Sequence, residues 1–70
     1  MEKFREKLQR LRQRQGLSQS QLAEMLSITR TYVSKMERGE KIPNIAMLLK
    51  IANIFGVTTD LLIRDELELE

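Results

Sequence analysis

The stretch from Leu17 to Gly39, LSQSQLAEMLSITRTYVSKMERG, decides the fold of this chain. It predicts two short helices joined by a three-residue turn. Ser18, with Gln21 three residues later, has the spacing of a capping box at the start of the first helix, and Thr29 is the expected N-cap of the second. The second helix places five polar side chains on one face, opposite Val33 and Met36: Arg30, Thr31, Ser34, Lys35 and Arg38. The stretch therefore has the pattern of a helix-turn-helix unit with a free outer face.

The N-terminal segment predicts one further amphipathic helix. Phe4, Leu8 and Leu11 follow the spacing i, i+4, i+7 between Glu2 and Gln15, which puts them on one narrow apolar stripe. Gly16 is the expected C-terminal cap.

The second half of the chain predicts two more helices. Asn44 is the expected cap of a helix that includes AMLLKIANIF, and Gly56 stops it. Thr58 caps a short fifth helix, whose leucines close the bundle. We therefore expect an all-α, five-helix domain over residues 1–64, with its turn motif at 18–38, followed by an acidic tail at 65–70.

Composition removes several classes of function. The 70 residues include no Cys and no His, which excludes disulfides, thiolate or imidazole zinc sites and the common nucleophile–base pairs of enzymes. No apolar run approaches the ~20 residues of a membrane span, and the first 15 residues are too charged for a signal peptide. We expect a cytoplasmic, non-enzymatic chain with no cofactor, no metal, no membrane contact and no small-molecule ligand.

Charge is distributed unevenly along the chain. Residues 1–41 carry ten Lys/Arg against five Asp/Glu, a net of +5, whereas residues 42–70 carry two against five, a net of −3. A basic first half fits a surface that faces phosphates. For five cations of the first helix the alternative is simple solvation of an amphipathic surface: Lys3, Arg5, Lys7, Arg10 and Arg14.

The motif resembles the phage-repressor-like (Xre/Cro-type) helix-turn-helix family. Gln19, Ala23 and Val33 match motif positions one, five and fifteen, and the resemblance extends from roughly Phe4 to Leu62. Position nine of the motif is usually Gly but is Ser27 here, which predicts a turn that is slightly strained or differently shaped. The resemblance implies the lambda-repressor-like five-helix fold and binding of double-stranded DNA, with the helix at about 29–38 in the major groove.

Four residues on the outer face of that helix are candidate base readers. Arg and Lys can donate to guanine O6 and N7, a Thr methyl can contact a thymine methyl, and a Ser hydroxyl can donate or accept. The alternative is the polar outer face that any amphipathic helix shows. The candidates are Arg30, Thr31, Ser34 and Lys35.

A second group is expected to contact the DNA backbone. The start of the second helix offers free N–H groups and the positive end of a dipole, to which a Gln amide adds a donor. Tyr32 can use its hydroxyl there or pack its ring against the adjoining loop, and Gln19 can instead face solvent. The candidate phosphate contacts are Gln19, Tyr32, Arg38, Lys41 and Asn44.

The resemblance also implies a structural ion pair between Arg12 of the first helix and Glu37 at the end of the third. A bidentate pair would lock the reading helix onto the first helix. The alternative is two independently solvated charges.

Apolar residues exceed what one face of the fourth helix can bury. Such a surplus in a small domain marks a partner surface, and in the resembling family that surface is a two-fold dimer contact. The expected interface residues are Ile54, Val57, Leu62 and Ile63.

The function expected from these features is a sequence-specific regulator of transcription. A homodimer would bind a pseudo-palindromic operator, as repressor or activator. The alternatives are a DNA-binding antitoxin, the targeting domain of a longer protein, and a protein-interaction module. The last is disfavoured because the face from Arg30 to Arg38 is basic and has no apolar anchors at i and i+4.

Overall fold

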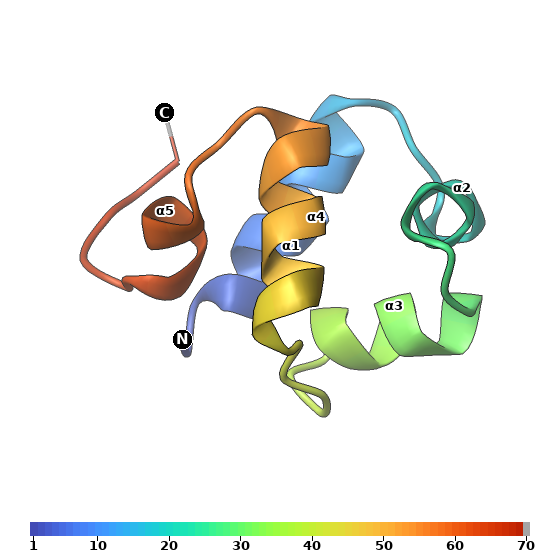
Figure 1. Ribbon diagram of the computed structural model, residues 1–70, viewed down its shortest axis with the longest axis horizontal. Coiled ribbons are helices and arrows are strands. Elements are labelled where there is room, and N and C mark those ends of the chain that lie inside the picture. Colours follow the sequence, from blue (N-terminus) through green and yellow to red (C-terminus); the bar gives the residue numbers. More distant parts are fainter. Residues whose placement is uncertain (70) are drawn as a thin grey trace.

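The computed structural model describes residues 1–69, which form five helices and no strand. The helices are α1 (Phe4–Arg14), α2 (Gln19–Leu26), α3 (Arg30–Glu37), α4 (Ile45–Phe55) and α5 (Thr59–Ile63). In Figure 1, α4 stands upright in front of α1, with α5 on one side and α2 and α3 on the other. The expected all-α, five-helix architecture is confirmed.

Side-chain caps define the start of every helix after α1. Ser18 Oγ accepts the Gln21 N–H at 3.0 Å, and Gln21 Oε1 accepts the Ser18 N–H at 2.7 Å, which confirms the capping box. Thr29, Asn44 and Thr58 each accept one backbone N–H in the same way, at the starts of α3, α4 and α5. These caps satisfy donors that a helix cannot pair internally, so the local sequence sets the helix boundaries.

The turn between α2 and α3 has a left-handed residue at Ser27. Its φ is 58° and its ψ is 42°, and it is the one non-glycine residue in 1–69 with positive φ. The Ile28 N–H donates to the Ala23 carbonyl at 2.9 Å. Ser27 thus ends α2 with the hydrogen bond that usually accompanies a left-handed glycine at a helix C-terminus. The serine therefore bears the backbone strain that glycine avoids.

All five helices contribute to one apolar core. The largest fully buried side chains are Leu8, Leu22, Leu26, Val33, Met36, Ile51 and Leu62. Leu62 was predicted to lie at a dimer interface, and this assignment is wrong, because its exposed fraction is 0%. The short α5 turns Leu62 inward and leaves Ile63 on the flank, only partly buried.

Lys7 is buried, although the sequence placed it among solvated or phosphate-facing cations. Its side chain is 5% exposed, and Nζ donates to the carbonyls of Leu61 at 2.5 Å and Arg64 at 2.8 Å. These carbonyls end α5, where a helix leaves acceptors unpaired and a cation is stabilised by the helix dipole. Lys7 thus ties α1 to α5.

Asp65, the first residue of the acidic tail, contacts the start of α1. Asp65 accepts the backbone N–H groups of Glu2 at 3.1 Å and Lys3 at 2.9 Å, and so caps a helix that has no side-chain cap of its own. The hydrogen bond from Lys3 is the main cause that lowers the pKa of Asp65 below its ordinary range. No helix within residues 1–69 has the length and apolar character to cross a membrane.

Candidate nucleic-acid interface

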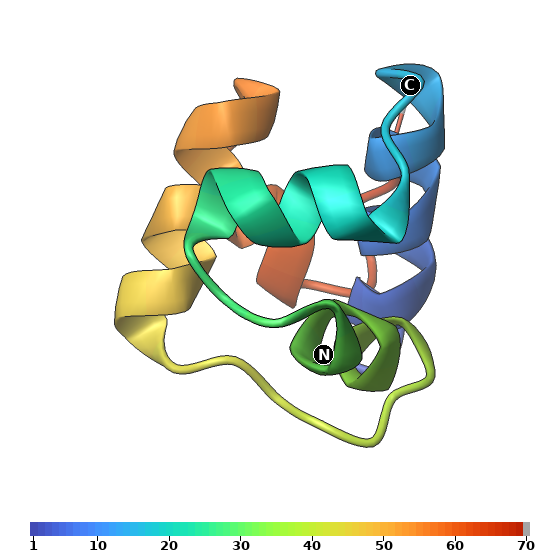
Figure 2. The same cartoon turned by 90° about the vertical axis from the view of Figure 1, so that its right-hand side faces the viewer.

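The third helix lies at the edge of the domain with its polar face outward. Figure 2 shows α2 crossing above α3, which is seen nearly end-on. Val33 and Met36 are fully buried beneath α3. The predicted base readers Arg30, Thr31 and Lys35 are exposed on the opposite side. The structure therefore brings these three side chains together on one accessible surface.

Arg12 and Glu37 meet in a bidentate ion pair. Arg12 Nε lies 2.6 Å from Glu37 Oε2 and Nη2 lies 3.0 Å from Oε1, while Nη1 donates to the Leu17 carbonyl at 2.8 Å. The two side chains are 12% and 4% exposed. Hydrogen bonding to Glu37 raises the pKa of Arg12 above its ordinary value. One guanidinium thus joins α1, the loop after α1 and the last turn of α3.

Gln19 lies at the first position of α2, and its side-chain amide already donates a hydrogen bond within the domain. Gln19 Nε2 donates to Glu37 Oε1 at 3.2 Å, so the amide that was expected on a phosphate also supports the ion pair. The capping box uses the N–H of Gln21, which leaves the backbone N–H groups of Gln19 and Ser20 for an external acceptor. An anion at this helix end would meet donors and the positive end of the dipole.

Asn44 caps α4 with its side-chain carbonyl. Oδ1 accepts the Met47 N–H at 2.8 Å, so only the amide NH₂ of Asn44 can reach outward. The N–H groups of Ile45 and Ala46 complete a second donor cluster of the same kind as the one at α2.

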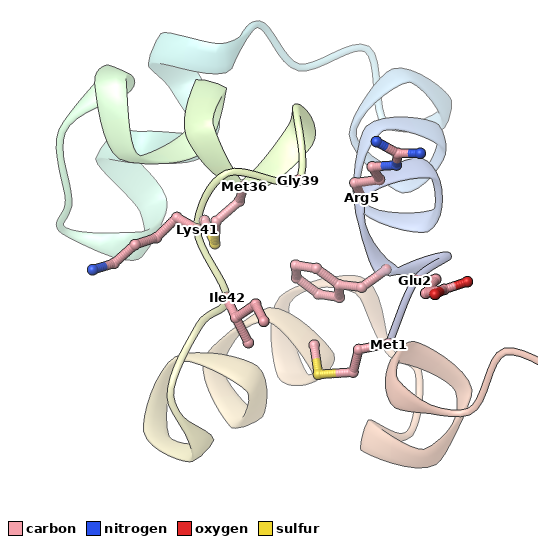
Figure 3. A pocket seen from close by; sticks show the side chains of 8 residues that line it. Met1, Glu2, Arg5, Met36, Gly39, Lys41 and Ile42 are labelled. Carbon is pink, nitrogen blue, oxygen red and sulfur yellow. The ribbon is translucent and has the colours of Figure 1, made fainter.

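Lys41 lies over the ring of Tyr32 on α3. Lys41 Nζ lies 6.0 Å from the centroid of the Tyr32 ring, within the range of a cation–π contact. Tyr32 is half-buried and packs against the core. Figure 3 shows the Lys41 amine extending away from the neighbouring depression.

Ser34 and Arg38 are linked to an acid that the sequence interpretation did not single out. Arg38 Nη1 donates to Ser34 Oγ at 2.9 Å, and Arg38 Nε donates to Glu40 Oε2 at 2.5 Å. A predicted base reader and a predicted phosphate contact therefore share one hydrogen-bonded chain with Glu40. The signal was available as an Arg and a Glu two residues apart in ERGEK.

An open depression of about 650 Å³ lies between the start of α1 and the loop after α3. Figure 3 shows Met1 and Ile42 on facing sides of it, and Arg5 beside Gly39. Gly39 has a φ of +78°, and a Cβ there would come within 3.0 Å of Arg5 Cδ. The glycine thus permits both the left-handed turn after α3 and the close passage of Arg5.

Lys50 is a supporting residue that the sequence interpretation missed. Its Nζ donates to the carbonyl of Leu26 at 2.8 Å, where α2 ends beside the turn. A lysine on the fourth helix thus satisfies an acceptor in the turn of the motif and links α4 to α2. Sequence spacing carries no signal for this contact, because the residues lie 24 positions apart.

The remaining residues of the predicted dimer surface are partly buried. Ile54, Val57 and Ile63 pack against the core with one side and face solvent with the other. More exposed apolar side chains lie elsewhere on α4, where Ile45 is 75% and Leu49 is 52% exposed. Apolar surface is thus present on α4 in addition to the predicted interface.

Comparison with known proteins agrees with this geometry. A family model described as helix-turn-helix matches residues 8–62. The HTH-type transcriptional activator BcrR of Enterococcus faecalis is 48% identical over 63 residues, which cover 90% of this chain and 31% of that protein. The SPbeta prophage-derived uncharacterized HTH-type transcriptional regulator YonR of Bacillus subtilis (strain 168) is 41% identical over 61 residues, which cover 87% of this chain and 56% of that protein.

The uncharacterized HTH-type transcriptional regulator YgzD of the same Bacillus strain is 36% identical over 54 residues, which cover 77% of this chain and 82% of that protein. The chain thus spans about a third of the length of BcrR and just over half that of YonR. Because the family model covers the motif and most of the helices around it, the chain belongs to the phage-repressor-like (Xre-type) helix-turn-helix family of DNA-binding domains.

Proposed function

We propose that this domain binds double-stranded DNA and regulates transcription from the site that it occupies. The observation that carries the proposal is the exposed polar face of α3, whose first turn presents Arg30 and Thr31 and whose last turn is held by the Arg12–Glu37 pair. In this motif the start of the second helix enters the major groove, where these side chains can bond base edges. The relatives named as transcriptional regulators support the same role.

The DNA backbone would be contacted on both sides of α3. The free N–H groups at the start of α2 approach one phosphate, and Lys41 with the start of α4 approaches another. Tyr32 in the first turn of α3 and Arg38 at its end add further donors. These contacts position the domain without reading sequence.

The binding unit would be a homodimer. One motif reads only a few base pairs, so a two-fold pair gives useful selectivity, with reading helices about 34 Å apart in successive major grooves. Ile54, Val57 and Ile63 would meet their symmetry mates, since the solvent-facing part of each is apolar. The operator would then be a pseudo-palindrome with half-site centres about 10 base pairs apart.

Selection of bound sequences from a random duplex pool tests the proposal in one experiment. We expect enrichment of a two-fold site with the stated spacing. Failure to shift any duplex at low salt would contradict DNA binding itself. Enrichment of a single asymmetric half-site would contradict the dimer and leave DNA binding in place.

A further inference from the structure

Glu40 places a carboxylate in the middle of the surface proposed to meet DNA phosphates. It lies between Arg38 and Lys41, in the loop that joins α3 to α4. Its Oε2 is 2.5 Å from Arg38 Nε, and the two side chains are 54% and 55% exposed. The guanidinium of Arg38 is thus occupied by an internal anion and by Ser34 Oγ in the free protein.

A carboxylate and a phosphate compete for the same guanidinium donors. Both accept charge-assisted hydrogen bonds from Arg in similar geometry. An exposed ion pair is weak and screened by salt, so a DNA phosphate can displace Glu40 from Arg38. The displacement reduces the binding free energy that the phosphate contact contributes, because the Arg38–Glu40 ion pair is broken as the Arg38–phosphate pair forms.

We propose that Glu40 is an internal competitor of the DNA backbone for Arg38 and lowers the affinity of the domain for duplexes of any sequence. The exchange also frees Ser34, because the same guanidinium donates to its hydroxyl. Glu40 then limits both a phosphate contact and the availability of a base-facing hydroxyl. This inference rests on the proposed function, since Arg38 must lie at the DNA surface.

Glu40→Gln tests the inference because glutamine keeps the shape and removes the charge. We expect binding to random duplex and to the selected operator to tighten about two- to fivefold at low salt, since no more can be gained than the strength of the exposed ion pair that binding breaks. The slope of log affinity against log salt should become steeper by about one. In the wild type the freed Glu40 carboxylate attracts a cation as the phosphate releases one, whereas in Glu40→Gln the release is uncompensated.

Glu66→Gln is the matched control. Glu66 pairs with Arg64 at the same spacing of two residues and at 3.0 Å, with exposed fractions of 65% and 54%. This pair follows α5, on the side of the molecule opposite α3 in Figure 1. Its removal changes net charge by the same amount and should leave affinity and salt slope nearly unchanged.

A double-mutant cycle separates competition for Arg38 from a general field effect. In an Arg38→Ala background, Glu40→Gln should no longer tighten binding. An equal gain in that background, or a gain no larger than that of Glu66→Gln, would overturn the inference. Absence of any duplex binding by the wild-type chain would overturn the proposed function, whereas wild-type binding with no response to Glu40→Gln overturns this inference alone.

Discussion

Ser27 shows how a single backbone dihedral is set by packing around it. The residue adopts φ 58° because α2 must end and α3 must begin within three residues while Leu26 and Val33 both stay buried. Lys50 satisfies the Leu26 carbonyl next to it. Gly56 ends α4 in the same way, with φ 64° and ψ 33°. The two turns therefore form a natural pair for testing strain.

Ser27→Gly should stabilise the domain by about 0.5–1 kcal/mol. Removing Cβ relieves the left-handed strain, partly offset by the greater freedom of glycine in the unfolded chain. The measurement is the urea midpoint at constant m-value. The reverse change, Gly56→Ser, should lower stability by a similar amount, because a Cβ at Gly56 meets nothing within 4 Å and backbone strain alone is added. A lower midpoint for Ser27→Gly would mean that the serine is not strained.

Arg30 and Lys41 should differ in how they affect DNA binding. Arg30→Ala should cost about 1–3 kcal/mol on the selected operator and relax preference at one or two base pairs, because a base contact is lost. Lys41→Ala should weaken binding to all sequences alike and reduce the salt slope by about one. Titrations against operator and random duplex at several salt concentrations measure both effects. Equal losses on both duplexes for Arg30→Ala would contradict base reading.

At the scale of elements, the Arg12–Glu37 pair decides how α3 is held. Packing of Val33 and Met36 fixes the depth of the helix but allows it to slide or rotate, since apolar contacts are not directional. The bidentate geometry adds direction at the last turn of α3. The orientation of the outer face of α3 thus depends on a residue of α1, Arg12.

A double-mutant cycle between Arg12 and Glu37 should show coupling above about 1 kcal/mol, because both side chains are largely buried and either one alone would lose its charged partner. The exposed Arg64–Glu66 pair is the comparison and should couple only weakly, because solvent screens it. Chemical denaturation measures both cycles. Glu37→Gln should also weaken operator binding under conditions where it remains folded. Additive effects of the two substitutions would show that the Arg12 and Glu37 side chains are not energetically coupled.

The contacts between the two ends of the chain predict a dependence of stability on pH. Bonds from the start of α1 lower the pKa of Asp65 below its ordinary value of 3.8. A carboxyl with a lowered pKa stabilises the fold above that ordinary value, and the contribution is lost as pH falls through the folded pKa. The free energy of unfolding of the wild type should therefore exceed that of Asp65→Asn at about pH 6, and the difference should shrink below about pH 4. Urea unfolding of both proteins across this range measures it, and a constant difference would contradict the proposed cap.

At the scale of the whole molecule, the proposed homodimer is argued from how little apolar surface a domain of this size can bury. A chain of 70 residues buries only ~60% of its unfolded surface. Ile54, Val57 and Ile63 remain partly exposed after folding. Leu62 must be removed from the predicted interface, since its burial is already complete within one chain.

Val57→Asp should give a monomer with an intact helical spectrum and weak operator binding, because a charge would be buried between the subunits. Sedimentation at micromolar concentration and circular dichroism separate assembly from folding. Leu62→Asp should instead unfold the domain, since it buries a charge in the core. Ile45→Asp is the control on the exposed part of α4 and should leave the dimer unchanged. A monomeric wild type that binds one half-site tightly would contradict the proposed assembly.

The sequence by itself determined the elements of this protein. Helix starts at Ser18, Thr29, Asn44 and Thr58 follow from short polar caps, and the stripe Phe4, Leu8, Leu11 follows from helical periodicity. Each signal lies within a few residues, so no tertiary information is needed. The outer face of α3 could be predicted for the same reason. The buried positions Val33 and Met36 follow helical spacing and leave the polar residues between them on the opposite side.

Only the tertiary structure decided which charges are free. Lys7, Gln19 and Lys50 look alike in sequence as solvated polar residues, yet each is bound to a partner that lies 18 or more positions away. Long flexible side chains take the acceptor that folding brings within reach, whether a helix-end carbonyl or a carboxylate. The same limit applies to Leu62, because a five-residue helix has too few apolar positions for periodicity to distinguish core from surface.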